Sequence, residues 1–140
     1  MIANIQWLID HKVIIAMPEG KPPVEELQLA SETLQVFMDE SDAPLVHILI
    51  DESKLEAMTI SLKILSDVFS FLKHPRLGWV IMYGSDDRMK KFISSMLTGM
   101  TKVRHRRFDT FEDSLDFLMT MDSTLPTMQN PLDSIRYLND

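Results

Sequence analysis

The feature that most constrains the fold of this chain is the alternation of strand-like and helix-like segments between Pro44 and Phe108. Residues 44–51 and 77–83 are apolar runs of strand length, and a segment with helical periodicity follows each of them. Strands that alternate with helices form a mainly parallel sheet with helices packed on its faces. Functional groups in such sheets usually lie beyond the carboxyl ends of the strands. We therefore expect a site where these two runs end.

The flanking residues extend the same pattern. Residues 5–9 and 12–17 are β-rich runs, and the short link Asp10-His11 between them predicts an antiparallel hairpin. A proline-rich turn precedes a helical stripe that begins at Val24. Further helices are predicted over 59–72, 86–101 and 110–121, with a short strand over 103–108.

The predicted element order is β-β-α-β-α-β-α-β-α. This order indicates an α/β fold with a mixed, mostly parallel five-stranded sheet covered by about four helices. The domain is expected to occupy residues 1–121. A polar tail, 122–140, follows, with a short helix expected from Asn130-Pro131 onward.

The composition is that of a globular protein with a sizeable core. The 140 residues are 45% hydrophobic, yet they contain no apolar run of the roughly 20 residues needed to span a bilayer. The chain has no cysteine, which removes disulfides and thiol catalysis from consideration. The amino terminus lacks a secretory signal pattern, so we expect a cytoplasmic protein.

Charge is strongly segregated along the chain. The net charge is −7, but residues 73–107 contain 9 basic and only 2 acidic side chains. The acidic total argues against nucleic-acid binding, whereas the basic zone is suited to an acidic protein surface or an anionic head group. The alternative is that these charges protect an edge strand from aggregation. The basic patch comprises Lys90, Lys91, Lys102, Arg104, Arg106 and Arg107, with His105 among them.

Patterns typical of catalysis are missing from the sequence. The four histidines, His11, His47, His74 and His105, have no metal-ligand spacing, so neither a metal nor another cofactor is expected. The Gly-x-Ser-x-Gly motif of serine hydrolases is absent. Gly84-Ser-Asp-Asp87 would repel a phosphate, and we interpret Ser85 as the cap of the next helix. These observations favour a protein that is not an enzyme.

Three segments resemble a known family. The initial hairpin, the strand end Leu49-Ile-Asp51 and the closing segment Phe108-Asp-Thr-Phe-Glu-Asp-Ser-Leu-Asp-Phe-Leu118 are similar to those of STAS-type domains. This family includes anti-sigma-factor antagonists and the cytoplasmic ends of sulfate transporters. The similarity covers about Ile5 to Met121. It implies a non-enzymatic regulatory module that works through protein–protein contact.

The resemblance also suggests where regulation would act. The family has an Asp-Ser-Ser-Gly-like helix start whose serine is phosphorylated, and this chain has Met58-Thr-Ile-Ser-Leu62 instead. Ser61 lies nearest the phosphorylated position and Thr59 is the alternative, although either could simply cap the helix. The predicted partner-binding residues are Asp51, Glu52, Ser53, Ser85 and Arg88.

A second hypothesis comes from the eleven methionines. Met89, Met96 and Met100 fall on one helical stripe, where methionine normally fills a core. The alternative is a cavity for an apolar ligand, which would make the protein a carrier or sensor of a small apolar or lipid molecule. A homodimer formed through the tail is a further expectation, and an enzyme with a dispersed site is the least favoured one.

Overall fold

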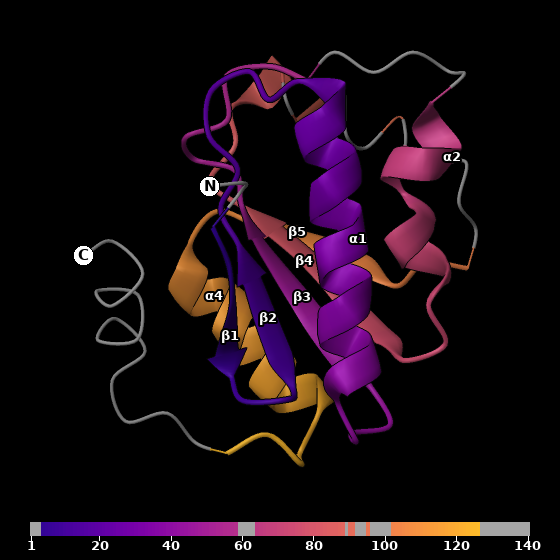
Figure 1. The fold of residues 1–140 in the computed structure, drawn as a ribbon. Helices are drawn as coiled ribbons and strands as arrows, with labels where there is room; N and C mark the ends of the chain where they lie inside the picture. The colour runs from indigo at the N-terminus through magenta and orange to yellow at the C-terminus, as the bar shows by residue number, and fades with distance from the viewer. Residues whose placement is uncertain (1–3, 59–63, 89, 92–94, 96–101, 127–140) are drawn as a thin grey trace.

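One sheet organises the computed structural model, which describes residues 4–58, 64–88, 90, 91, 95 and 102–126. The strands lie in the order β1-β2-β3-β4-β5 (Figure 1). β1 pairs with β2 in antiparallel orientation, whereas β2 with β3, β3 with β4, and β4 with β5 are parallel pairs. The strands are β1 (Ile5–Ile9), β2 (Val13–Ala16), β3 (Val46–Asp51), β4 (Leu77–Tyr83) and β5 (His105–Phe108).

The predicted hairpin is confirmed, with a link one residue longer than expected. The turn comprises Asp10, His11 and Lys12, and the Lys12 amide donates to the Ile9 carbonyl over 3.0 Å. His11 has a φ of 60°, a left-handed conformation that is uncommon outside glycine. Because Lys12 belongs to the turn, β2 begins at Val13 rather than at residue 12.

Helices cover both faces of the sheet. The helices include α1 (Val24–Glu40), α2 (Leu65–Val68), the 3₁₀ helix η1 (Ser70–Lys73) and α4 (Phe111–Met121). The described residues 87, 88, 90, 91 and 95 are helical as well. Figure 1 shows α1 in front of the sheet, α2 beside α1, and α4 behind the sheet. Side chains alternate between the faces, so Ile48 and Val80 pack with the α1 side while Leu49 and Ile81 pack with the α4 side. The protein therefore has two apolar layers separated by the sheet.

The helix predicted over 59–72 is interrupted near its end. Residues 59–63 lie outside the described part of the chain, and the helical backbone changes from α2 to η1 around Phe69. The hydroxyl of Ser70 lies 3.1 Å from that of Ser31 on α1, and the Phe71 amide donates to the same Ser31 hydroxyl. Contacts with α1 thus determine the local backbone, against the continuous apolar periodicity of the sequence.

The region after β4 is described only in part. Most of the predicted helix 86–101 falls outside the described residues, as do Met89, Met96 and Met100. The prediction that Ser85 caps this helix is wrong, because the helical residues begin at Asp87 and the Lys90 amide donates to the carbonyl of Asp86, which puts Asp86 at the N-cap position. The Ser85 hydroxyl instead accepts a hydrogen bond from Arg107.

The last helix begins as predicted, but the packed domain extends past its end. The Thr110 side chain accepts a hydrogen bond from the Asp113 amide, which is an N-cap. Beyond α4, Leu125 is buried and the Asp122 carboxylate lies 2.8 Å from His47 Nε2. Residues 122 and 125 of the predicted tail therefore pack against the α/β domain. The described part of the chain contains no helix that is both long and apolar enough to cross a bilayer.

Candidate functional site

The carboxyl ends of β3 and β4 meet, as predicted from the strand order. The amide of Ser53 donates to Asp51 Oδ1 over 2.9 Å, which folds the chain back immediately after β3. Gly84 follows β4 with a φ of 85°, and a Cβ at this position would lie 3.1 Å from the Cβ of Ser53. The chain requires glycine here for both its left-handed backbone and this close approach. The segments 51–58 and 84–88 consequently form one surface, which we call the carboxyl-edge surface.

Backbone hydrogen bonds hold the first segment in place. The Gly20 amide donates to the Lys54 carbonyl, and the Glu56 amide donates to the Gly20 carbonyl, each over 2.8 Å. Lys54 Nζ also lies 3.7 Å from a carboxylate oxygen of Glu19. Residues 52–58 are therefore fixed against the turn that precedes α1, although they are not part of a regular element.

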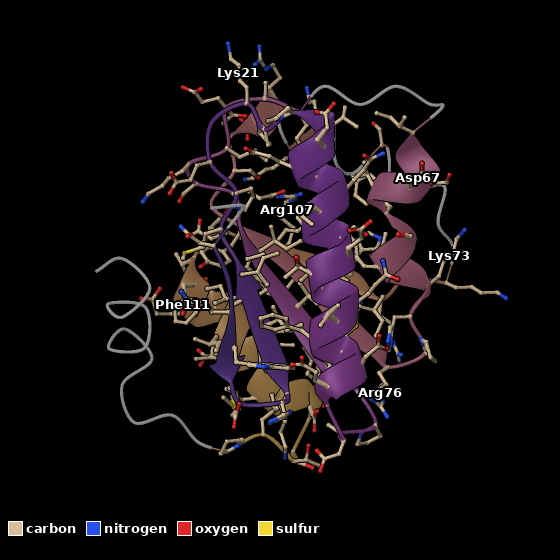
Figure 2. All side chains as sticks on the ribbon, in the orientation of Figure 1. Lys21, Asp67, Lys73, Arg76, Arg107 and Phe111 are labelled. Carbon is tan, nitrogen blue, oxygen red and sulfur yellow. The ribbon has the colours of Figure 1, made fainter. Side chains whose placement is uncertain are left out.

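A buried ion pair between Glu52 and Arg107 connects the two segments of the carboxyl-edge surface to β5. Arg107 Nη1, on β5, donates to Glu52 Oε1 over 2.5 Å and to the Ser85 hydroxyl over 2.6 Å. The Glu52 side chain is 2% exposed and that of Arg107 is 17% exposed. Figure 2 shows Arg107 near the middle of the molecule, beside α1 in this view, whereas Lys21 and Lys73 project outward. Burial raises the pKa of Glu52 above its ordinary value, against the opposing effects of Arg107 and Ser85.

The structure corrects the predicted exposure of two residues, Glu52 and Arg107. Glu52 was predicted on the partner-binding surface but lies inside, whereas Ser53 and Arg88 are exposed and Asp51 and Ser85 are partly exposed. Arg107 was predicted in an exposed basic patch but is bound to Glu52. The missed signal was strand alternation, because Glu52 continues the inward series Ile48 and Ile50.

The remaining members of the basic patch do not form one surface with Arg107. Arg106, the residue before it, faces the opposite side of the sheet, where its guanidinium lies 5.3 Å from the Trp79 ring centre. Arg104 is exposed and donates to the Leu77 carbonyl. Lys90 lies 3.5 Å from Asp109, and Lys91 and Lys102 are exposed. Alternation along β5 therefore divides the predicted patch.

The predicted phosphorylation residues cannot be placed in this geometry. Ser61 and Thr59 both lie outside the described residues. Met58, the last described residue before them, is partly buried against the core. The described chain thus reaches the start of the predicted regulatory segment at the carboxyl-edge surface.

All four histidines lie at the other end of the sheet. His11 precedes β2, His47 and His105 lie in the first residues of β3 and β5, and His74 precedes β4. His47 is buried, accepts a hydrogen bond from the Trp79 amide at Nδ1 and contacts Asp122 through Nε2. It is a core residue with both ring nitrogens hydrogen-bonded. Within the described residues, no cluster of three or more acidic or histidine side chains could hold a metal ion.

An apolar pocket lies beside the ion pair, between α1 and the sheet. Its volume is about 110 Å³. Glu52, Leu55 and Met58 line it from the carboxyl-edge segment. The other lining side chains are almost all apolar and come from both sheet and helices, among them Leu27, Ala30, Leu34, Ile50, Phe69 and Met82. The sequence suggested an apolar cavity from the methionines, and Met58 and Met82 are among the lining residues. The stripe on which that suggestion was based, Met89, Met96 and Met100, lies outside the described residues.

Comparisons with known proteins bear on the fold. No protein-family model matches the chain, and no curated protein matches it either. Among solved structures, the chain is similar to an uncharacterized protein of the DUF3478 family with a SpoIIAA-like fold from Shewanella loihica PV-4. The TM-score is 0.58 at 21% identity, over 76% of this chain and 83% of that one.

The chain has a SpoIIAA-like fold. This is the fold of anti-sigma-factor antagonists and STAS domains, so the predicted resemblance is confirmed at the level of fold. The α/β class and the five-stranded mixed sheet agree with it. At 21% identity, the similarity establishes the fold of this chain and not its activity.

Proposed function

We propose that this protein is a non-enzymatic regulatory module that binds another protein through its carboxyl-edge surface. The observation that carries the proposal is the buried contact of Arg107 with Glu52 and Ser85. Desolvating an ion pair is costly, and such pairs are retained in some proteins because they specify one geometry. Here the pair connects both loops of the surface to β5. This supports a surface kept in one shape for recognition.

The side chains that this surface presents are suited to recognition. Ser53, Lys54 and Glu56 are exposed on one segment, and Asp86, Asp87 and Arg88 are exposed on the other. Fixed charges of both signs provide specificity and register with a complementary partner surface. The partner expected from this chemistry is a protein with a mixed charge pattern rather than a nucleic acid.

The positions of the histidines support a role without catalysis. The hydroxyls of Ser53 and Ser85 lie at the carboxyl edge, whereas every histidine lies at the amino ends of the parallel strands. His47 and Asp51 are four residues apart on β3, which corresponds to about 13 Å along an extended strand. A histidine base would have to lie within hydrogen-bond reach of a serine nucleophile. This arrangement favours binding over hydrolysis.

Site-specific crosslinking tests the proposal. A photo-crosslinking residue at position 54 or 87 should capture a defined partner in the host cell, while the same residue at Glu32, exposed on α1, should not. With the purified partner, Lys54→Glu and Arg88→Glu should each weaken binding at least tenfold. Lys73→Glu, an exposed charge reversal on η1, is the matched control and should leave binding unchanged. Equal crosslinking at positions 32 and 54 would contradict the proposal.

Phosphorylation of Ser61 or Thr59 remains a prediction. A phosphate on either residue would add about two negative charges to the segment that follows Met58 in the sequence and would change the fit of the protein to a charged partner. Ser61→Asp should therefore change the affinity for the captured partner without lowering the melting temperature. An unchanged affinity would remove phosphorylation at Ser61 from the proposal.

The pocket favours a second candidate function, transport or storage of a small apolar ligand. Among the described residues, its lining is almost entirely apolar, with Glu52 as the charged exception. A carrier should retain its ligand through gentle purification, whereas a regulator should be purified empty or phosphorylated. Native mass spectrometry of protein from its own host distinguishes these outcomes.

A further inference from the structure

We propose that the pocket binds a small neutral apolar molecule, or the apolar end of a larger one, and that its occupancy controls the carboxyl-edge surface. The pocket lies on the α1 side of the sheet, with walls from α1, η1 and the strands β3 and β4. The regulatory half of this inference rests on the proposed function. The binding half is independent of it.

The volume of the pocket limits the size of the ligand. Apolar cavities of about 150 Å³ remain dry and bind benzene. This pocket, at about 110 Å³, is somewhat smaller, so it suits one ring or a short alkyl segment. A full-length fatty acyl chain would not fit without rearrangement.

The polar groups of the pocket determine the charge of the ligand. The Ser31 hydroxyl is already bonded to Ser70 and to the Phe71 amide. The Glu52 carboxylate already binds Arg107, so the pair leaves no net charge for a ligand to neutralise. A carboxylate or ammonium group placed here would lose its hydration without gaining an ionic partner among the described lining residues. The pocket therefore selects neutral molecules.

One backbone segment connects the pocket with the surface. The side chains of Leu55 and Met58 line the pocket, while those of Ser53, Lys54 and Glu56 in the same segment are exposed. A ligand that displaces Leu55 or Met58 must move the backbone that presents the exposed residues. Glu52 extends this connection to the second loop through Arg107 and Ser85. Because coupling between two sites is reciprocal, partner binding would change ligand affinity by the same factor.

Amide NMR of the full chain titrated with toluene and with benzoate tests the inference. The two probes share one ring and differ in charge. Toluene should cause saturable shifts at lining residues such as Leu34 and Ile50, and also at Ser53, Lys54 and Gly84 on the surface. Benzoate at equal concentration should cause no saturable shift at these positions.

A matched pair of variants locates the site. Ala30→Leu fills the pocket from α1 and should weaken toluene binding at least tenfold. Glu32→Leu adds the same side chain at an exposed position of the same helix and should leave binding unchanged. If Ala30→Leu does not fold, the smaller Ala30→Val replaces it, with a severalfold weakening expected.

The possible outcomes distinguish ligand binding in the pocket from control of the carboxyl-edge surface. Absence of saturable toluene binding would overturn the ligand site, and binding with shifts confined to the lining residues would overturn control of the surface. Failure of the crosslinking experiment together with toluene-dependent shifts at Ser53 and Gly84 would reject the proposed partner function while leaving the ligand site supported.

Discussion

At the scale of single residues, one glycine permits a buried hydrogen-bonded histidine. Gly78 lies in β4 directly against the His47 ring, and a Cβ there would lie only 2.7 Å from His47 Cε1. The His47 ring accepts a hydrogen bond from the Trp79 amide and contacts the Asp122 carboxylate. It therefore cannot move away without losing these interactions. A glycine within a strand often marks such a close approach.

Gly78→Ala is therefore expected to destabilise the protein by about 1–3 kcal/mol, because overpacking displaces the imidazole or the strand. Urea unfolding measures this loss. The control is the same substitution in a His47→Ala background, where the space is free and the loss should be smaller. An equal loss in both backgrounds would show that His47 is not the obstacle.

At the scale of elements, the carboxyl end of α1 is stabilised by a distant residue. The last turn of α1 has no basic side chain of its own. Arg76, just before β4, donates to the carbonyls of Met38, Asp39 and Ser41. A guanidinium at this position satisfies terminal carbonyls and complements the negative end of the helix dipole.

Arg76→Met should lower the free energy of unfolding by about 1–3 kcal/mol, the typical effect of losing hydrogen bonds to a charged donor. Hydrogen exchange should also accelerate most in the last turn of α1. Arg88→Met, at an exposed position, is the control and should change stability little. Uniform acceleration across α1 would indicate a general loss of packing rather than a lost cap.

At the scale of the whole molecule, the chain beyond α4 is bound to the opposite end of the sheet from the candidate site. Asp122 contacts His47, Lys12 Nζ donates to the Thr124 carbonyl, and Leu125 is buried in the α4 layer. Burial tends to raise the pKa of Asp122, but hydrogen bonds from Thr124 and His47 outweigh it and hold the pKa below the ordinary 3.8.

This lowered pKa predicts how the contribution of Asp122 depends on pH. A carboxyl group with a lower pKa in the folded state stabilises the protein above its unfolded pKa, and this stabilisation is lost as the pH falls through the folded pKa. The difference in urea midpoint between the natural protein and Asp122→Asn should thus be larger at pH 6 than at pH 3. A difference that does not change with pH would rule out the ionised carboxylate as its source.

Much of the candidate site was accessible to sequence reasoning, but its key contact was not. The meeting of Asp51, Ser53 and Ser85 follows from two neighbouring parallel strands, each visible as an apolar run. The pairing of Glu52 with Arg107 joins residues 55 positions apart. Glu52 and Arg107 were both interpreted as exposed, because charged side chains are rarely buried without a partner. The sequence does not show which residue that partner is.

The sequence by itself determined the elements of this protein: the hairpin, the α/β order, the Thr110 cap of the last helix and the strand ends that form the site. Local periodicity and capping act over a few residues, so they can be read from the chain directly. Only the tertiary structure decided the break at Phe69, the burial of Glu52 with Arg107, and the apolar pocket. These features depend on which side chains the register of the sheet and the packing of α1 bring together, and that juxtaposition arises only when distant segments meet.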